Sequence, residues 1–218
     1  LVKQAFEGDL VKIIVNRTPF YAESGGQIGD KGLITSQDLE VSIENVRKKN
    51  NIFIHSGRIK TGVLTVNSSV QMNVTPSFRQ RTTSNHTATH LLQSALKLSI
   101  DSSVSQRGSL VSNDRLRFDF NAPKPLTLKE LEDMEVRINQ WINEDHPIQI
   151  KTMPIKEAMA AGALAMFGEK YGDVVRVVDV PGVSMELCGG THVTRTSQLG
   201  TFKIINETGI ASGIRRIE

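Results

Sequence analysis

Two short pairs of metal-ligand residues, far apart in the chain, place the strongest constraint on how this sequence folds. His86 and His90 lie in NHTATHLL, and Cys188 and His192 lie in ELCGGTHV, so both pairs have the same four-residue spacing. On a helix, side chains four positions apart share a face. One thiolate and three imidazoles form a ligand set that suits Zn²⁺. If they share one ion, the fold must bring segments 98 positions apart to the same point.

The residues between the paired ligands exclude a zinc protease. The HExxH helix of those enzymes carries a glutamate as general base, whereas Thr, Ala and Thr separate His86 from His90 here. Two glycines follow Cys188 and disfavour a helix, so segment 188–192 is expected to form a turn. Less specific interpretations remain, because paired histidines can be ordinary polar residues and a single cysteine a small hydrophobe. Four protein ligands would make a closed structural site, and three plus water a catalytic one.

Composition favours a soluble, globular, cytoplasmic protein. The 218 residues suffice for one large or two small domains. No segment approaches 18 consecutive apolar residues, so no membrane span is expected. A single cysteine excludes an internal disulfide and favours a reducing compartment. The start without Met and the abrupt GIRRIE end suggest a fragment of a longer protein.

The pattern of apolar residues and glycines predicts two domains. Residues 11–75 contain short Val- and Ile-rich segments separated by Gly-rich turns, which is typical of a small barrel or sandwich. Residues 82–100 have apolar residues at helical spacing instead. We place the boundary near 76–81, which gives a Gly-rich β-barrel subdomain, 1–80, and a second domain, 81–218.

Helices and strands are mixed in the second domain. Thr127 and Glu130 form a capping box that starts a helix, and this helix is expected to end before Pro147. A short helix is predicted at 154–162. Strands are predicted at 115–120, 147–152, 173–180 and 200–206. The elements do not alternate strictly, so the predicted class is α+β.

Seven segments, in chain order, resemble the editing region of alanyl-tRNA synthetases. They are RTPFYAESGGQIGDKG (17–32), NHTATHLL (85–92), SQRGSLV (105–111), RLRFDF (115–120), MFGEKYGDVVRVV (166–178), ELCGGTHV (186–193) and GIRRIE (213–218). The resemblance implies a small N-terminal β-barrel followed by an α+β editing domain similar to that of threonyl-tRNA synthetase. It also implies that the four paired residues are zinc ligands, and that Thr89 and Gln106 lie in the editing pocket.

The activity implied by this resemblance is that of an aminoacyl-tRNA deacylase. The reaction is hydrolysis of the ester bond of Ser-tRNA(Ala) and Gly-tRNA(Ala), with Ala-tRNA(Ala) spared. An alanine pocket cannot exclude glycine or serine strongly, because one methylene is worth only about 1–3 kcal/mol of discrimination. Thr89 is the candidate partner for the serine hydroxyl, with Gln106 close by. The sequence offers no clear general base.

Expected partners are the acceptor end of tRNA(Ala) and the rest of a synthetase chain. Residues 1–110 carry 13 basic and 8 acidic side chains, whereas residues 111–218 carry 13 and 15. The expected phosphate contacts are Arg17, Lys31, Arg79, Arg81, Arg107, Arg215 and Arg216. Two alternatives remain open: a tRNA-binding module with a purely structural zinc, and a stand-alone deacylase that acts in trans.

Overall fold

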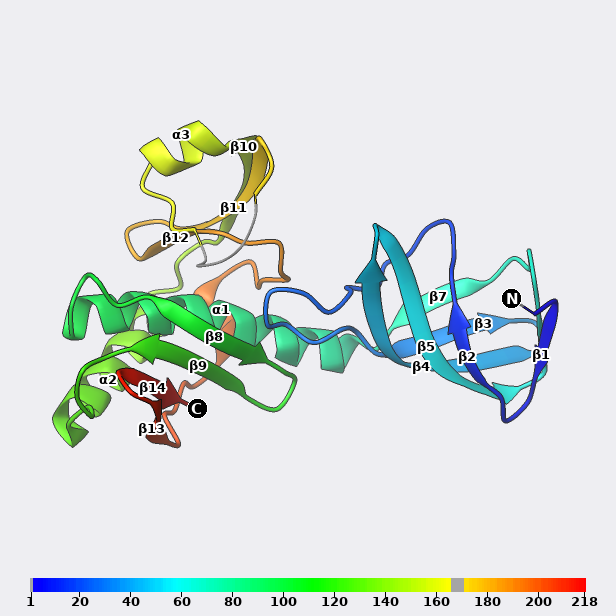
Figure 1. The fold of residues 1–218 in the computed structure, drawn as a ribbon, viewed down its shortest axis with the longest axis horizontal. Helices are drawn as coiled ribbons and strands as arrows, with labels where there is room; N and C mark the ends of the chain where they lie inside the picture. The colour runs from blue at the N-terminus through cyan, green and yellow to red at the C-terminus, as the bar shows by residue number, and fades with distance from the viewer. Residues whose placement is uncertain (1, 166–170) are drawn as a thin grey trace. The chain divides into compact units, whose positions relative to one another are not determined.

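The structure, a computed structural model, describes residues 2–165 and 171–218 (Figure 1). The chain folds into two compact units, Leu1–Arg81 and Thr82–Glu218. The beginning of the MFGEKYGDVVRVV segment, at 166–170, lies outside the described residues. No helix in the described part of the chain is long and apolar enough to cross a membrane.

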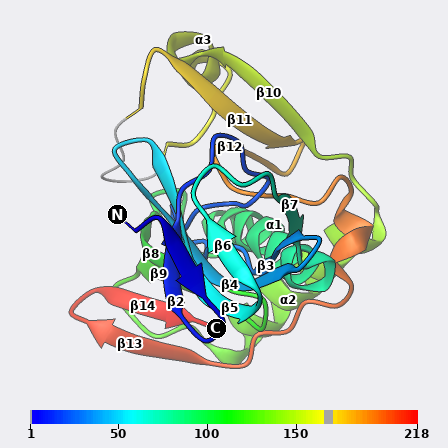
Figure 2. The same cartoon turned by 90° about the vertical axis from the view of Figure 1, so that its right-hand side faces the viewer.

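The first unit is built on a five-stranded antiparallel sheet with a separate two-stranded ribbon (Figure 2). In sheet order the strands are β2 (Leu10–Ile13), β5 (Ile52–Thr61), β4 (Leu39–Lys49), β3 (Gly32–Ser36) and β7 (Gln71–Val74). The ribbon pairs β1 (Gln4–Phe6) with β6 (Val63–Thr65). Alternate residues of the central strands point inward, as the period of two in a strand requires, and the core contains Ile34, Val41, Ile43, Val46 and Ile59.

The closed barrel predicted for this unit is wrong. Among the described strands, the edge strands β2 and β7 each pair on one side only, β2 with β5 and β7 with β3. A groove lined by residues of both edge strands, including Ile13 and Met72, lies where a closing ladder would have to form. Each edge strand has only four residues, so little hydrogen bonding is available to close the sheet.

The long helix α1 (Pro76–Ser99) begins six residues before the predicted start at Thr82. Proline is favoured in the first turn of a helix because its missing N–H would have no partner there. The first turn is held by Arg79, whose guanidinium pairs with the buried carboxylate of Asp30. Sequence periodicity missed this turn because its residues carry few apolar side chains.

The second unit, over its described residues, combines two antiparallel sheets with three helical segments besides α1. The four-stranded sheet has the order β13 (Glu207–Ala211), β14 (Ile214–Ile217), β9 (Leu116–Asn121) and β8 (Gln106–Val111). The three-stranded sheet has the order β10 (Gln149–Pro154), β11 (Val174–Val180) and β12 (Ser184–Leu187). The helical segments are α2 (Leu128–Asn143), α3 (Ile155–Ala160) and the 3₁₀ turn η1 (Thr196–Leu199).

The main core of this unit lies between α1, α2 and the four-stranded sheet (Figure 1). Its fully buried side chains include Leu91, Leu92, Phe118, Met134 and Ile138. The residues of α1 from His86 to Leu96 are all buried. This helix therefore offers no solvated face at the level of the HTATH motif.

Local signals in the second unit predicted helices well and one strand badly. The capping box of Thr127 and Glu130 is present at the start of α2. The predicted strand 200–206 is wrong, because no residue of that segment belongs to a strand. Its middle lies along α2, and only its last two residues bond to the backbone of Glu218. Asn139 exchanges two hydrogen bonds of 2.9 Å with the backbone of Phe202, and Glu135 accepts from the Ile204 amide at 3.0 Å.

Candidate metal centre

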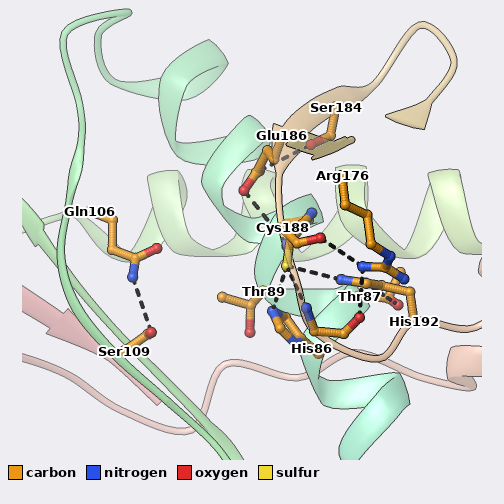
Figure 3. Close-up of polar contacts among 12 residues, drawn as sticks. His86, Thr87, Thr89, Gln106, Ser109, Arg176, Ser184, Glu186, Cys188 and His192 are labelled. Carbon is orange, nitrogen blue, oxygen red and sulfur yellow. Dashed lines mark hydrogen bonds and ion pairs between the residues drawn. The ribbon is translucent and has the colours of Figure 1, made fainter. Parts of the chain in front are cut away.

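The four paired residues come together at one point in the second unit. Figure 3 labels three of them, His86, Cys188 and His192. His86 and His90 project from α1, Cys188 directly follows β12, and His192 lies in the succeeding loop. Their potential ligand atoms all lie within 4.8 Å of one another. Cys188 Sγ is 3.4 Å from His86 Nε2 and 3.3 Å from His192 Nε2. We call these four residues the His₃Cys cluster.

The donor atoms of the His₃Cys cluster fit a tetrahedral ion. Zinc bonds of about 2.0–2.3 Å separate neighbouring ligand atoms by roughly 3.3–3.7 Å, close to the distances around Cys188. His90 Nδ1 is buried and has no hydrogen-bond partner among residues 2–165 and 171–218. A buried imidazole nitrogen without a partner costs free energy unless it binds something. The chemistry and spacing of these residues therefore suit a soft divalent metal.

Burial keeps the imidazoles in the protonation state that metals require. Burial, followed by the charge of Arg176, lowers the pKa of His86 to about 4. Burial and neighbouring positive charges hold the pKa values of His90 and His192 well below the ordinary range. Burial also raises the pKa of the Cys188 thiol to about 11. A bound cation reverses that effect, because it stabilises the thiolate.

The turn that presents Cys188 is held by an arginine that sequence analysis missed. Strand β12 pairs with β11 up to Leu187, and Arg176 of β11 then donates from Nη1 to the carbonyl oxygens of Cys188 and Gly190, at 2.6 and 2.9 Å. The Cys188 amide donates back to the Arg176 carbonyl at 3.0 Å. A charged residue inside the apolar strand DVVRVVDV was the available signal.

Glu186 is a second residue near the cluster that the sequence did not single out. Its side chain is 4% exposed, and Oε1 accepts a 3.0 Å hydrogen bond from Ser184 Oγ. Oε2 lies 3.6 Å from His90 Nε2. Burial raises the pKa of this carboxyl group to about 8. A cation bound at the cluster would favour the ionised form of this group, and a carboxylate beside a ligating histidine is a common orienting device in metal sites. The signal in the sequence was an acidic residue in an apolar strand just before the cysteine.

Both threonines of HTATH are buried, with different partners. Thr89 is 5% exposed, so it is not a helix-surface residue, and its hydroxyl donates to the Asn85 carbonyl at 2.8 Å. Thr87 contacts His192 instead, with 3.1 Å between Oγ1 and Nδ1. Gln106 lies on β8, and its amide donates to Ser109 Oγ at 3.0 Å (Figure 3). The editing-pocket role of Thr89 and Gln106 stays a prediction.

The other two histidines have separate surroundings. His55 is fully buried in the first unit, where Nδ1 lies 3.1 Å from the Ile13 carbonyl and Nε2 lies 2.8 Å from Thr18 Oγ1. His146 follows α2, and its Nε2 is 2.7 Å from Glu144. Neither belongs to the His₃Cys cluster.

The seven expected phosphate contacts differ in how their charges are already used. Arg79 pairs with Asp30, Arg215 with Glu207 and Arg216 with Asp119. These three guanidinium groups would have to exchange a carboxylate for a phosphate. Lys31 lies over the Phe78 ring at 5.4 Å. Arg17, Arg81 and Arg107 are exposed. All seven contacts stay predictions.

Comparisons with known proteins match both ends of the chain. The family model described as tRNA synthetases class II (A) matches residues 1–77. The model described as the threonyl and alanyl tRNA synthetase second additional domain matches residues 175–218, which include Cys188 and His192. His86 and His90 lie between these two ranges. Both lie within the alignments to individual relatives described next, which cover the whole of this chain.

The whole chain is similar to a segment of longer proteins. It is 94% identical over 217 residues to the alanine–tRNA ligase of Prochlorococcus marinus (strain NATL1A). It is 59% identical over 217 residues to the alanine–tRNA ligase of Microcystis aeruginosa (strain NIES-843 / IAM M-2473). Each match covers 100% of this chain but only 24% and 25% of the respective relative.

Proposed function

We propose that the chain is a segment of an alanyl-tRNA synthetase, and that this segment removes wrongly attached amino acids. The substrates would be Ser-tRNA(Ala) and Gly-tRNA(Ala), with Ala-tRNA(Ala) spared. The observation that supports this most is the buried His₃Cys cluster, of which Cys188 and His192 lie in the region that matches the second additional domain. The expected partners are the acceptor end of tRNA(Ala) and the remainder of a synthetase chain.

The proposed reaction is hydrolysis of an ester. Water adds at the acyl carbon, the bond to the ribose oxygen breaks, and that oxygen takes up a proton. The products are a free amino acid and a tRNA with a free terminal hydroxyl. We propose that the His₃Cys cluster holds Zn²⁺. When bound, the ion supplies a positive charge that can polarise the carbonyl or hold the substrate's amino group.

Thr89 is suited to distinguishing serine from alanine. Its hydroxyl proton is directed to the Asn85 carbonyl, so its oxygen remains an acceptor. A serine hydroxyl can donate to that oxygen, whereas the alanine methyl group cannot. A buried polar group left without a partner costs about 1–3 kcal/mol, which favours the serine substrate. Glycine lacks the hydroxyl as well, so its hydrolysis needs another explanation.

A second candidate is a tRNA-binding module whose zinc is purely structural. Four protein ligands characterise closed structural sites, and three residues of the His₃Cys cluster are buried while His192 is partly buried. This alternative predicts tRNA binding without hydrolysis. The stand-alone deacylase differs only in acting without the rest of a synthetase.

The test is hydrolysis of Ser-, Gly- and Ala-tRNA(Ala) by the 218-residue chain, with zinc content measured on the same sample. Editing predicts loss of serine and glycine but not alanine, and no activity for a folded Cys188→Ala variant. Thr196→Val is the control, because Thr196 is fully buried at the start of η1, four positions after His192, and its hydroxyl contacts Trp141 instead of the cluster. A folded, zinc-loaded chain that binds tRNA without hydrolysing it would support the binding module. Unfolding of Cys188→Ala would do so too.

A further inference from the structure

The hydroxyl of Thr87 is fully buried and contacts three groups at once. Its Oγ1 lies 3.2 Å from the Thr83 carbonyl oxygen, one helical turn back. It also lies 3.2 Å from the Val193 amide nitrogen and 3.1 Å from His192 Nδ1. The side chain thus connects α1 to the loop that carries the last residue of the His₃Cys cluster.

The direction of each hydrogen bond follows from counting protons. A hydroxyl has one proton and two acceptor lone pairs. The Thr83 carbonyl can only accept, so it receives the hydroxyl proton, and the Val193 amide can only donate, so it takes one lone pair. The remaining lone pair faces His192 Nδ1, and this nitrogen must therefore carry a proton.

That arrangement leaves the other ring nitrogen of His192 available. In a neutral imidazole with a proton on Nδ1, Nε2 carries the lone pair. Nε2 lies 3.3 Å from Cys188 Sγ, on the side of the His₃Cys cluster (Figure 3). The opposite arrangement, with the hydroxyl donating to Nδ1, would put a proton on Nε2 and remove it as a ligand.

We propose that Thr87 is a positioning residue that fixes the Nδ1–H tautomer and the ring orientation of His192. Through the Val193 amide, the same hydroxyl also holds the loop against α1. The inference rests on the proposed function in one respect, that the cluster binds a metal. It gives the first threonine of HTATH a role distinct from that of Thr89, because its oxygen has no lone pair left for a substrate.

The affinity test compares Thr87→Val with Thr87→Ser in the 218-residue chain. Valine keeps the shape but removes the hydroxyl, and loss of an outer hydrogen bond to a ligating histidine typically weakens metal binding about 10–100-fold. We expect that loss in Zn²⁺ affinity, measured by competition with a chelator. Thr87→Ser should bind like the unaltered chain. The control Thr196→Val should keep its affinity, since Thr196 donates to Trp141 and accepts from the His146 amide.

A second measurement reads the tautomer directly. Nitrogen-15 NMR of the metal-free chain should show neutral His192 with its proton on Nδ1, and Thr87→Val should shift this population. A proton on Nε2 in the unaltered chain would overturn the proposal. So would a Thr87→Val variant that is folded and binds Zn²⁺ as tightly as Thr87→Ser. If the unaltered chain bound no Zn²⁺, the proposed function would fail, and the tautomer would still decide the role of Thr87.

Discussion

The sulfur of Cys188 lies 3.4 Å from Nε2 of His86, although 102 positions separate the two residues. The contact brings the turn after β12 onto the buried face of α1 without a covalent link. A metal shared by these two side chains would tie the two segments together. The stability of the second unit should then depend on metal.

Adding Zn²⁺ to the metal-free chain should raise its thermal unfolding temperature. A ligand at a hundred times its Kd stabilises the folded state by about 2.7 kcal/mol. Cys188→Ala should show little of this rise, because one of the four ligand atoms is gone. Thermal unfolding with and without Zn²⁺, followed by the fluorescence of Trp141 in the second unit, is the measurement. An equal rise in both chains would mean that the ion binds elsewhere.

Replacing Arg176 should loosen the turn that presents Cys188. Arg176→Leu leaves the carbonyl oxygens of Cys188 and Gly190 without their donor. An unsatisfied buried polar group costs about 1–3 kcal/mol, and urea unfolding should show a loss of this size. Arg195→Leu serves as the comparison, since Arg195 is half-exposed and pairs with Asp145 at the surface. Equal effects of the two substitutions would contradict the assigned role.

Thr89→Val should impair the hydrolysis of Ser-tRNA(Ala) more than that of Gly-tRNA(Ala). Loss of the hydrogen bond to the serine hydroxyl costs about 1–3 kcal/mol, which lowers the rate on Ser-tRNA(Ala) by about 5–150-fold. The glycine substrate has no hydroxyl and loses no such bond. Thr89→Ser should restore the preference for serine. Initial rates on both substrates test this. A parallel decline on both would indicate general damage to the site instead of lost recognition.

Changing Arg79 to alanine should lower the stability of the first unit, whereas changing Arg17 to alanine should weaken tRNA binding. Arg79 neutralises Asp30, which is 1% exposed. Its removal leaves a buried charge unpaired and should destabilise the first unit by about 3–5 kcal/mol. Arg17 is exposed, and its loss should weaken tRNA binding and reduce the salt dependence by about one phosphate contact. Binding titrations at several salt concentrations, with unfolding curves, separate the two. Unaltered tRNA binding by Arg17→Ala would remove it from the interface.

The first unit should lose stability in mild acid because of His55. Burial lowers the pKa of this histidine below its ordinary value of 6.5, while its hydrogen bond to Ile13 opposes the shift. The unfolded chain then binds more protons, so the free energy of unfolding falls as pH drops below about 6.5, by at most about 1.4 kcal/mol per pH unit. The free energy of unfolding can be measured by hydrogen exchange of β5 amides between about pH 7.5 and 5. This range spans the ordinary histidine pKa. His55→Gln should flatten the profile, and an unchanged profile would assign the effect to another group.

Features encoded within a few residues could be predicted from the sequence. The capping box at Thr127 and the ligand pairs of the His₃Cys cluster depend on local spacing, and the structure has both arrangements. The wrong strand at 200–206 shows the limit of this approach. Its alternation resembles that of a strand, but the partner that captures its backbone is Asn139, 63 positions away.

The residues missed around the cluster share the same cause. Arg176 and Glu186 stand out only once β11 and β12 are paired and the turn after them reaches α1. The open sheet of the first unit likewise depends on which strands meet, which strand propensity does not specify. Chain order and composition left these pairings undetermined.

The separation of the ligands along the chain also has a consequence for synthesis. The ribosome releases His86 and His90 about a hundred residues before Cys188 and His192. A growing chain therefore carries two histidines that have no thiolate to join them until most of the second unit has emerged. Contacts between such distant segments form late, because closing the intervening loop comes first. Metal capture by all four residues would mark a chain synthesised beyond residue 192, and a chain truncated before residue 188 would never reach that state.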